Sequence, residues 1–534
     1  MIFKLQTIMK HIKLFSVSFF AFLTVLISAN AQSKKNFVGK KETLTEVQLK
    51  RWSHLDLSKD SIPGMSVDKA YAQVLKGKKG VKIVVGIIDS GVDIDHEDLK
   101  SVIWTNKKEI PANGIDDDKN GYIDDVHGWN FLGNSNNETL EITRILKKGE
   151  VESDIYKSSK IKYDQKYQEA IDQKEQVDVI SLANKSVGDY LNKKDYTLKE
   201  VQDIKTISPY LSRNVQIMTS IIGQFGADFN DKIDDYIEQT SDRLNYHLNL
   251  EFDGRKVVGD NPNDLNDTKY GNNIVYGPDK KGALHGTHVA GIIAGVRNNL
   301  KGSDGITNNA QIMSIRAVPN GDEYDKDVAL AIRYAVNNGA KVINGSFGKA
   351  ISPNKEWVFD AIKYAESKDV LVVIAAGNDG ENIDLADNAN FPNDSKDNKT
   401  EFSNNLLMVG AIDNKYGEAV ITDFSNYGSF NVDVFAPGEE IYSSVPNNNY
   451  KYEDGTSMAS PNAAGVAVLI RSYYPKLSAA KVKKIIMESG TPLPAVLELG
   501  KNREKKSVAE TSRSGKMINA YQALLMAEKM SKQK

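Results

Sequence analysis

Apolar runs typical of β-strands alternate with stretches of helical periodicity from Ser66 onward. Residues 81–88 (VKIVVGII) are rich in β-branched side chains and precede the turn signal Asp89-Ser90-Gly91, which predicts a buried strand. Further strands are predicted at 310–318, 341–344 and 370–376, and the helices between them at 327–338 and 357–368. Strands that alternate with such helices build βαβ units, so we expect an α/β fold with a parallel central sheet.

Residues 134–250 have a different composition. They contain one proline, Pro209, and four glycines, and their charged and apolar residues recur at helical spacing. Helix start signals are present at Thr197-x-x-Glu200 and at Ser208-Pro209. We therefore predict a mostly helical insertion, with no catalytic grouping of residues inside it.

The first 31 residues have the features of a targeting segment. A positively charged start with three lysines precedes the uncharged run 14–28, and small residues frame a break at Ala29-Asn30-Ala31. This pattern predicts a secretory signal peptide cleaved after Ala31. The alternative is an uncleaved membrane anchor, for which the run is short. No later stretch is long and apolar enough to span a membrane, so we expect a mature protein outside the cytoplasm: secreted, periplasmic or on the cell surface.

Composition excludes several classes of function. The 534 residues include 68 Lys and Arg against 71 Asp and Glu, a formal charge of −3. This balance argues against nucleic-acid binding as the main function, because that requires a strongly basic domain. The sequence has no cysteine, which excludes disulfide scaffolds, thiolate metal sites and a cysteine nucleophile. No spacing of His and Glu indicates a catalytic zinc site, and no organic cofactor is expected.

Three short segments carry residue types suited to nucleophilic catalysis. Asp89 ends the first strong strand in IIDSGVD, His285 begins HGTHVAG, and Ser457 lies in GTSMASP. A serine hydroxyl needs a base within hydrogen-bond reach, an imidazole can take and return the proton, and a carboxylate behind the imidazole holds its tautomer. The order Asp, His, Ser matches one of the convergent triad families. Taken singly, each segment also fits a turn, a packing residue or a helix N-cap.

Together these segments resemble the Asp, His and Ser motifs of the subtilisin-like serine peptidases (subtilases), over about residues 60–133 and 251–530. The resemblance implies a three-layer subtilisin-like fold with a mostly parallel central sheet, interrupted by the helical insertion. It also implies a secreted serine endopeptidase that hydrolyses peptide bonds of protein or peptide substrates through an acyl-enzyme. In these roles Asp89 orients His285, His285 is the general base and acid, and Ser457 attacks the scissile carbonyl.

The resemblance assigns further residues of the site. Asn378, in VVIAAGND, is expected to donate its side-chain amide to the oxyanion together with the backbone N–H of Ser457. His288 is expected to be structural. The two walls of the primary substrate pocket are expected at Ser346, Phe347 and Gly348 and at Ala375, Ala376 and Gly377. Lys349 stands where the family commonly has a second glycine, which leaves the depth of the pocket open; a large apolar side chain before the scissile bond is the default expectation.

The expected organisation is a signal peptide at 1–31, an N-terminal lead-in at 32–65, the first part of the peptidase domain at 66–133, the insertion at 134–250 and the second part at 251–530. The insertion lies between the Asp and His motifs, where it could gate the cleft or bind a protein partner. A non-enzymatic binding protein on a degenerate peptidase scaffold is the alternative, and the presence of all the triad residues weighs against it. An esterase or lipase of the α/β-hydrolase type is disfavoured because Ser457 lies in GTSMA and not in G-x-S-x-G.

Two candidate sites for a structural Ca²⁺ ion are present. Asp116, Asp118, Asn120 and Asp124, with Gly121 at the bend, match positions of a calcium loop. His127 stands where the loop needs a bidentate Glu, so Asp117, Asp125 or a distant residue has to complete this site; a solvated acidic turn is the alternative. The resemblance suggests a second site at Asp98 and Asn299.

Overall fold

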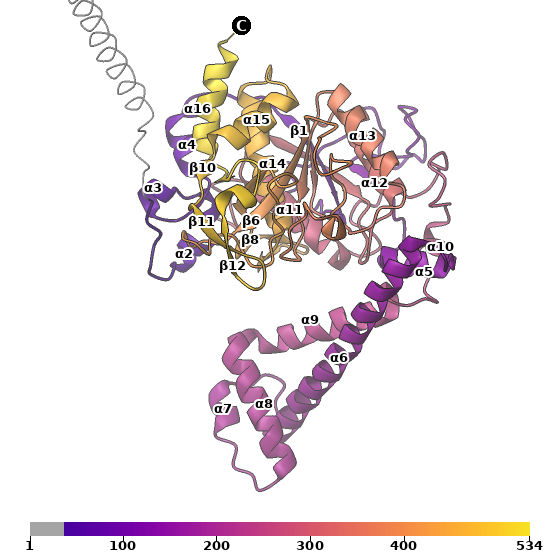
Figure 1. Ribbon diagram of the computed structural model, residues 1–534, viewed down its shortest axis with the longest axis vertical. Helices are drawn as coiled ribbons and strands as arrows, with labels where there is room; N and C mark the ends of the chain where they lie inside the picture. Colours follow the sequence, from indigo (N-terminus) through magenta and orange to yellow (C-terminus); the bar gives the residue numbers. More distant parts are fainter. Residues whose placement is uncertain (1–36, 534) are drawn as a thin grey trace, which may run out of the picture.

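Nine strands form one sheet at the centre of the molecule, in the order β10-β13-β7-β6-β5-β4-β1-β3-β2. The structure is a computed structural model that describes residues 37–533 (Figure 1). The strands are β1 (Ile83–Asp89), β2 (Gly128–Asn130), β3 (Ala310–Arg316), β4 (Val342–Gly345), β5 (Leu371–Ala375), β6 (Leu406–Ile412), β7 (Val434–Pro437), β10 (Thr491–Pro492) and β13 (Lys516–Met517). Neighbours from β2 to β13 run parallel, whereas β10 pairs with β13 in the antiparallel sense. The predicted α/β fold with a mostly parallel sheet is confirmed.

Helices cover the sheet, so its central strands are buried along their whole length. Strands β4 to β7 have no exposed position, as expected for a parallel sheet with both faces covered. Helices α11 (Leu284–Ala294) and α14 (Thr456–Tyr473) pack against each other and against the sheet, and so do α12 (Asp325–Asn337) and α13 (Lys355–Ser367). A Cβ added at Gly86 of β1 would lie 2.9 Å from the Cβ of Ala335, which places α12 in close contact with that strand.

The elements predicted from periodicity occur close to their expected positions. The helices predicted at 327–338 and 357–368 are α12 and α13, and the strands predicted at 310–318, 341–344 and 370–376 are β3, β4 and β5. Strands β2, β6, β7, β10 and β13 were not predicted. Two small hairpins, β8 (Ile441–Val445) with β9 (Asn449–Glu453) and β11 (Val496–Leu499) with β12 (Glu504–Ser507), lie outside the main sheet.

The segment before β1 packs onto the body of the protein. It contains the short helices α2 (Glu46–Leu49), α3 (Leu57–Asp60) and α4 (Val67–Gln73), and α4 contacts the C-terminal helix α16 (Ala520–Ser531). Trp52 is 1% exposed, and its indole N–H donates to the carbonyl of Glu439 at 3.0 Å. The predicted signal peptide at 1–31 lies outside the described residues. Within 37–533 we find no helix with the length and apolar character needed to cross a bilayer.

Between β2 and α11 the chain forms a helical arm that projects away from the sheet (Figure 1). Its helices are α5 (Glu141–Lys148), α6 (Asp154–Leu191), α7 (Leu198–Gln202), α8 (Pro209–Phe225) and α9 (Phe229–Asp242), followed by a π-helical turn at Arg243–His247 and, on the way back, by α10 (Arg255–Val258). The start signals act as expected: Thr197 forms a capping box with Glu200, and Ser208 caps α8 with Pro209 at its start. The arm has a small core of its own, formed by Ala183, Val187, Tyr196, Val201, Met218, Ile222, Phe229 and Ile233.

Candidate active site

Asp89 and His285 form a hydrogen-bonded pair at the carboxyl end of β1, an interior strand of the sheet. Asp89 is the last residue of β1, and His285 lies in the first turn of α11. Oδ1 of Asp89 lies 2.7 Å from Nδ1 of His285. Asp89 is 1% exposed, whereas the His285 side chain is 38% exposed. The carboxylate is therefore held in a buried position behind an imidazole that faces the solvent.

The aspartate determines the protonation chemistry of His285. Burial alone lowers the pKa of His285, but the charge of Asp89 and the hydrogen bond to it outweigh burial, so the pKa lies above its ordinary value. A carboxylate can only accept, so Nδ1 of His285 carries the proton and Nε2 is left as the basic nitrogen. This arrangement is the one a general base needs.

His288 occupies a different environment three residues further on. Its side chain is fully buried, its Nε2 lies 3.2 Å from the carbonyl of Lys451, and burial lowers its pKa to about 3. A histidine that stays neutral and buried cannot exchange protons with a bound substrate. This geometry fits the structural role expected for His288.

Ser457 lies in the first turn of α14, where its side chain is half-buried. Its hydroxyl donates to the backbone carbonyl of Ser346 at 3.2 Å. The structure therefore joins two of the three expected triad residues, Asp89 and His285, by a hydrogen bond. The hydroxyl of Ser457 is turned toward the expected pocket wall. The backbone N–H groups of the first turn of a helix have no intrahelical acceptor, so the N–H of Ser457 is free to bind an oxyanion.

Asn378 follows β5 and contacts the residue before Ser457. Its Oδ1 accepts hydrogen bonds from the backbone N–H of Thr456 at 2.9 Å and from the Thr456 hydroxyl at 2.8 Å. With Oδ1 held in this way, Nδ2 is the free end of the amide and lies beside the turn that begins α14. Sequence reasoning had not identified Thr456, which orients this amide; its position next to Ser457 in GTSM was the available signal.

The two expected pocket walls lie at the carboxyl ends of two neighbouring strands, β4 and β5. The Ser346 hydroxyl donates to the carbonyl of Ser457 at 2.8 Å, so the first wall is tied directly to α14. Ser346 and Phe347 are buried and Gly348 is exposed, while on the second wall Ala375 and Ala376 are buried and Gly377 is half-buried with φ of 99°.

Asn390 connects the two walls and was not identified from the sequence. Its Nδ2 donates to the carbonyl of Ala376 at 3.1 Å, and its amide lies next to Gly348, where an added Cβ would come within 2.6 Å of Oδ1. A side chain at position 348 would therefore collide with Asn390. Asn390 lies in an irregular loop without periodicity, so no pattern in the sequence indicated this contact.

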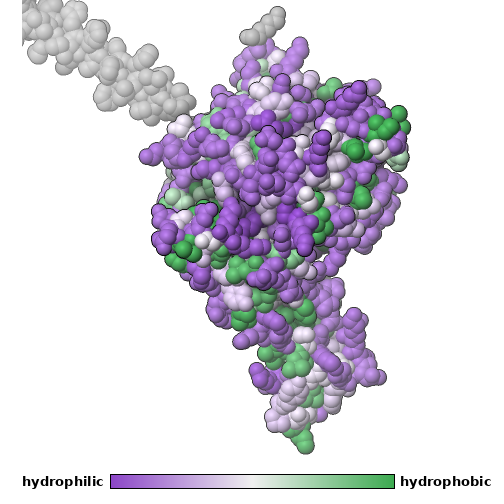
Figure 2. Space-filling model, turned by 90° about the vertical axis from the view of Figure 1, so that its right-hand side faces the viewer, coloured by the Kyte–Doolittle hydropathy of each residue, from purple (hydrophilic) through white to green (hydrophobic). Residues whose placement is uncertain are grey.

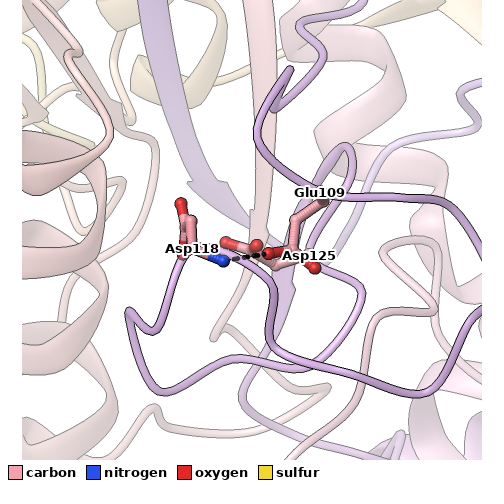
Figure 3. A group of neighbouring side chains, drawn as sticks. All are labelled: Glu109, Asp118 and Asp125. Carbon is pink, nitrogen blue, oxygen red and sulfur yellow. Dashed lines mark hydrogen bonds between the residues drawn. The ribbon is translucent and has the colours of Figure 1, made fainter.

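Two carboxylates of the acidic loop after the first strand lie next to a third, from a residue that precedes the loop (Figure 3). Oxygen atoms of Glu109, Asp118 and Asp125 all lie within 4.8 Å of one another. The backbone N–H of Asp118 donates to Oε1 of Glu109 at 3.1 Å, whereas Oε2 of Glu109 is buried and has no hydrogen-bond partner among the described residues. Burial raises the pKa of Asp125 to about 6.

The other three loop residues singled out from the sequence have different contacts. Asp116 accepts from the backbone N–H groups of Asn120 and Gly121 at 3.0 and 2.8 Å, and so closes the turn. Asp124 accepts from the backbone of Asn113 at 3.1 Å, away from the carboxylate group. Asn120 donates to Asp125 at 3.0 Å. Glu109 was missed because it lies before the loop, outside the spacing used to find the site.

Asp98 and Asn299, the second candidate pair, are in contact. Nδ2 of Asn299 donates to Oδ1 of Asp98 at 2.5 Å, and the backbone N–H of Val296 donates to the same oxygen at 3.2 Å. Asp98 is 1% exposed, and burial raises its pKa. The pair joins the segment after β1 to the loop after α11.

A family model described as the subtilase family matches residues 80–514, and the chain therefore belongs to the subtilase family. It is 41% identical over 189 residues to the "Thermophilic serine proteinase" of Bacillus sp. (strain AK1), covering 35% of this chain and 42% of that protein. It is 37% identical over 206 residues to the "Cell wall-associated protease" of Bacillus subtilis (strain 168), covering 38% of this chain and 21% of the relative. The chain thus spans less than half the length of these two relatives.

Among solved structures, the chain is similar to one described as proteases from Pseudoalteromonas arctica PAMC 21717. The two are 31% identical, with 46% of this chain and 70% of that chain covered and a TM-score of 0.36.

Proposed function

We propose that the protein is a serine endopeptidase that works outside the cytoplasm and hydrolyses peptide bonds of protein or peptide substrates. The observation that carries the proposal is the 2.7 Å contact between the buried carboxylate of Asp89 and Nδ1 of His285. This contact leaves Nε2 of His285 as a base at the rim of the sheet. Family membership supports the same activity, and the charged and apolar pattern of the first 31 residues supports the location.

The reaction begins when the hydroxyl of Ser457 turns from the carbonyl of Ser346 toward His285. Its oxygen attacks the scissile carbonyl carbon while Nε2 of His285 takes the hydroxyl proton, and Asp89 stabilises the resulting imidazolium. The carbonyl oxygen becomes an oxyanion that accepts hydrogen bonds from Nδ2 of Asn378 and from the N–H of Ser457. Collapse of this intermediate breaks the C–N bond, and His285 returns the proton to the leaving amine. A water molecule then attacks the carbonyl carbon of the acyl-enzyme while His285 takes a proton from it. Collapse of this second intermediate breaks the bond to the Ser457 oxygen, His285 returns the proton to that oxygen, and the acid product is released.

Substituting Ser457 by alanine tests this assignment directly. Wild-type protein is expected to hydrolyse casein or a fluorogenic peptide, and a serine-directed sulfonyl fluoride is expected to abolish the hydrolysis. Ser457→Ala is expected to keep only a residual kcat, about 10⁶-fold below wild type, because the nucleophilic oxygen is missing. Equal hydrolysis by wild type and Ser457→Ala would overturn the proposal.

We infer that a structural Ca²⁺ ion binds at Glu109, Asp118 and Asp125, with Asp98 and Asn299 as a second, weaker candidate. Three carboxylates within 4.8 Å repel one another, and oxygen ligands of this kind are those that Ca²⁺ prefers. The buried Oε2 of Glu109 lacks a partner among the described residues, as a ligand oxygen does before it binds an ion. When bound, the ion would cross-link the acidic loop; it takes no part in the chemical steps.

Calcium is expected to raise the melting temperature of the wild-type protein relative to the same protein in EGTA. A ligand at 100 times its Kd adds about 2.7 kcal/mol to the free energy of unfolding. Glu109→Gln is expected to lose most of the increase, whereas the exposed control Glu150→Gln is expected to keep it. Differential scanning fluorimetry measures the shift. An identical melting temperature of the wild type with calcium and with EGTA would contradict both sites. If Asp98→Asn lost the calcium-dependent increase and Glu109→Gln kept it, the ion would be assigned to Asp98 and Asn299.

The role of the arm as a surface for a protein partner stays a prediction. Its apolar side chains include several that are more than half exposed, at Ile161, Leu182, Tyr190, Ile207 and Tyr210. Figure 2 shows apolar patches on the arm and near its junction with the body.

A further inference from the structure

The side chain of Lys349 is buried between the expected pocket wall and the base of the arm. The residue follows Gly348 directly and is 5% exposed. Its ammonium group lies 2.8 Å from Oε2 of Glu141 and 3.0 Å from Oδ1 of Asp325, and it donates to the carbonyl of Glu323 at 2.8 Å. Glu141 is the first residue of α5, the helix that begins the arm. One side chain therefore spans from the substrate wall to an element that the insertion supplies.

The backbone of Lys349 is fixed as firmly as its side chain. Its N–H donates to the carbonyl of Phe391 at 3.0 Å and its carbonyl accepts from the N–H of Phe391 at 2.9 Å. Phe391 follows Asn390, the residue that lies against Gly348 and donates to the carbonyl of Ala376. Any displacement of Lys349 is therefore passed to both walls of the pocket.

The base of the arm is itself held by charges. Arg144 of α5 lies 2.6 Å from Oε2 of Glu141, and its guanidinium also donates to the carbonyls of Asp322 and Glu323. Burial raises the pKa of Glu141, but Arg144 and Lys349 outweigh it and lower the pKa to about 2. Two cations thus balance the carboxylates of Glu141 and Asp325, and none of these four side chains is more than 9% exposed. Removing one member of such a group leaves an uncompensated buried charge.

We propose that Lys349 is a positioning residue for substrate binding, which fixes the wall 346–348 by anchoring it to Glu141 at the base of the arm. The inference rests on the proposed function. It adds that the base of the arm, through Lys349, fixes the position of one wall of the substrate pocket. Lys349 contacts none of the groups that react, so it acts through the wall. This role explains a lysine where the family resemblance leads one to expect glycine, because only a long cationic side chain reaches the carboxylate of α5.

The experiment compares Lys349→Met and Glu141→Gln with wild type, using a peptide long enough to lie along both walls. Both variants are expected to raise KM about tenfold, the effect of roughly 1.4 kcal/mol. The rate of reaction with methanesulfonyl fluoride, whose methyl group is too small to lie along the walls, is expected to stay within about twofold of wild type, because the proposed triad is untouched. Hydrogen exchange of the amides at 346–349 is expected to become faster in both variants.

Lys483→Met is the matched control. Lys483, on α15 (Ala479–Ser489), is 6% exposed, and its ammonium group lies 2.8 Å from Glu401 and 3.4 Å from Asp433. The Lys483→Met variant is expected to have a lower melting temperature, with KM and the hydrogen exchange at 346–349 unchanged. Loss of stability without a change in KM in Lys349→Met and Glu141→Gln would overturn the proposal, as would an equal rise of KM in Lys483→Met.

Two further outcomes are informative. If Lys349→Met does not fold, Glu141→Gln decides, because it keeps the size of the side chain and removes only its charge. If wild-type protein neither hydrolyses peptides nor reacts with the sulfonyl fluoride, the proposed function has failed. The anchoring of the wall is then judged by hydrogen exchange alone: faster exchange in Glu141→Gln supports it, and unchanged exchange overturns it.

Discussion

Replacing His285 by alanine is expected to lower kcat by about 10⁶-fold, the order of loss measured for the equivalent change in a subtilisin. Without the imidazole, no group in contact with Asp89 can take the proton from Ser457, and the buried carboxylate loses the partner that it orients. Steady-state hydrolysis of a fluorogenic peptide measures kcat. KM is expected to change little, because the pocket walls lie on other elements.

His288→Gln is the control for this prediction. It removes a histidine from the same helix, three residues away, where the ring is buried against the carbonyl of Lys451. We expect a lower melting temperature and a loss of kcat below about tenfold in the folded protein, because the His288 ring contacts the carbonyl of Lys451 and not Asp89 or Ser457. A loss in His288→Gln as large as that in His285→Ala would contradict the assignment of His285 as the base.

Asn378→Ala is expected to lower kcat by about 10²- to 10³-fold, or ~2.7–4 kcal/mol, with KM nearly unchanged. This magnitude comes from the corresponding donor of a subtilisin, so it is borrowed from the family. The reason for the loss is geometric. Thr456 holds Oδ1 of Asn378, so we expect Nδ2 to face the negative charge that develops only in the transition state.

Asn404→Ala serves as the matched control, because Asn404 is an exposed asparagine whose amide contacts Glu366. It is expected to leave both kcat and KM unchanged. If Asn378→Ala raised KM and left kcat intact, the side chain would act in ground-state binding and not in stabilising the oxyanion.

Periodicity in the sequence was sufficient to predict the class of fold. The strand before Asp89 was indicated by its run of β-branched residues, and α12 and α13 were indicated by apolar residues at helical spacing. Each of these signals lies within the element itself. Strands of two residues, such as β10 and β13, are too short to have a period, and they exist because their neighbours in the sheet provide hydrogen-bond partners. The residues proposed as the triad could be singled out because each lies in a distinctive short motif.

The contacts that no motif contains could not be predicted. Lys349 and Glu141 are separated by 208 positions, and their ion pair depends on how the arm is attached to the body. Glu109 joins Asp118 and Asp125 through a fold of the loop that the spacing of the acidic residues does not show. Asn390 contacts both walls from an irregular segment. In each case the partner is chosen by tertiary packing, which local sequence patterns do not record.

A double-mutant cycle of Ser457 and His285 tests most directly whether the two residues act as one catalytic unit. The kcat values of Ser457→Ala, His285→Ala and the double variant are measured on the same peptide. We predict three values that agree within about tenfold, because residues of one unit lose their function together. Losses that multiply in the double variant would show that the serine and the histidine act independently, and would contradict the catalytic mechanism.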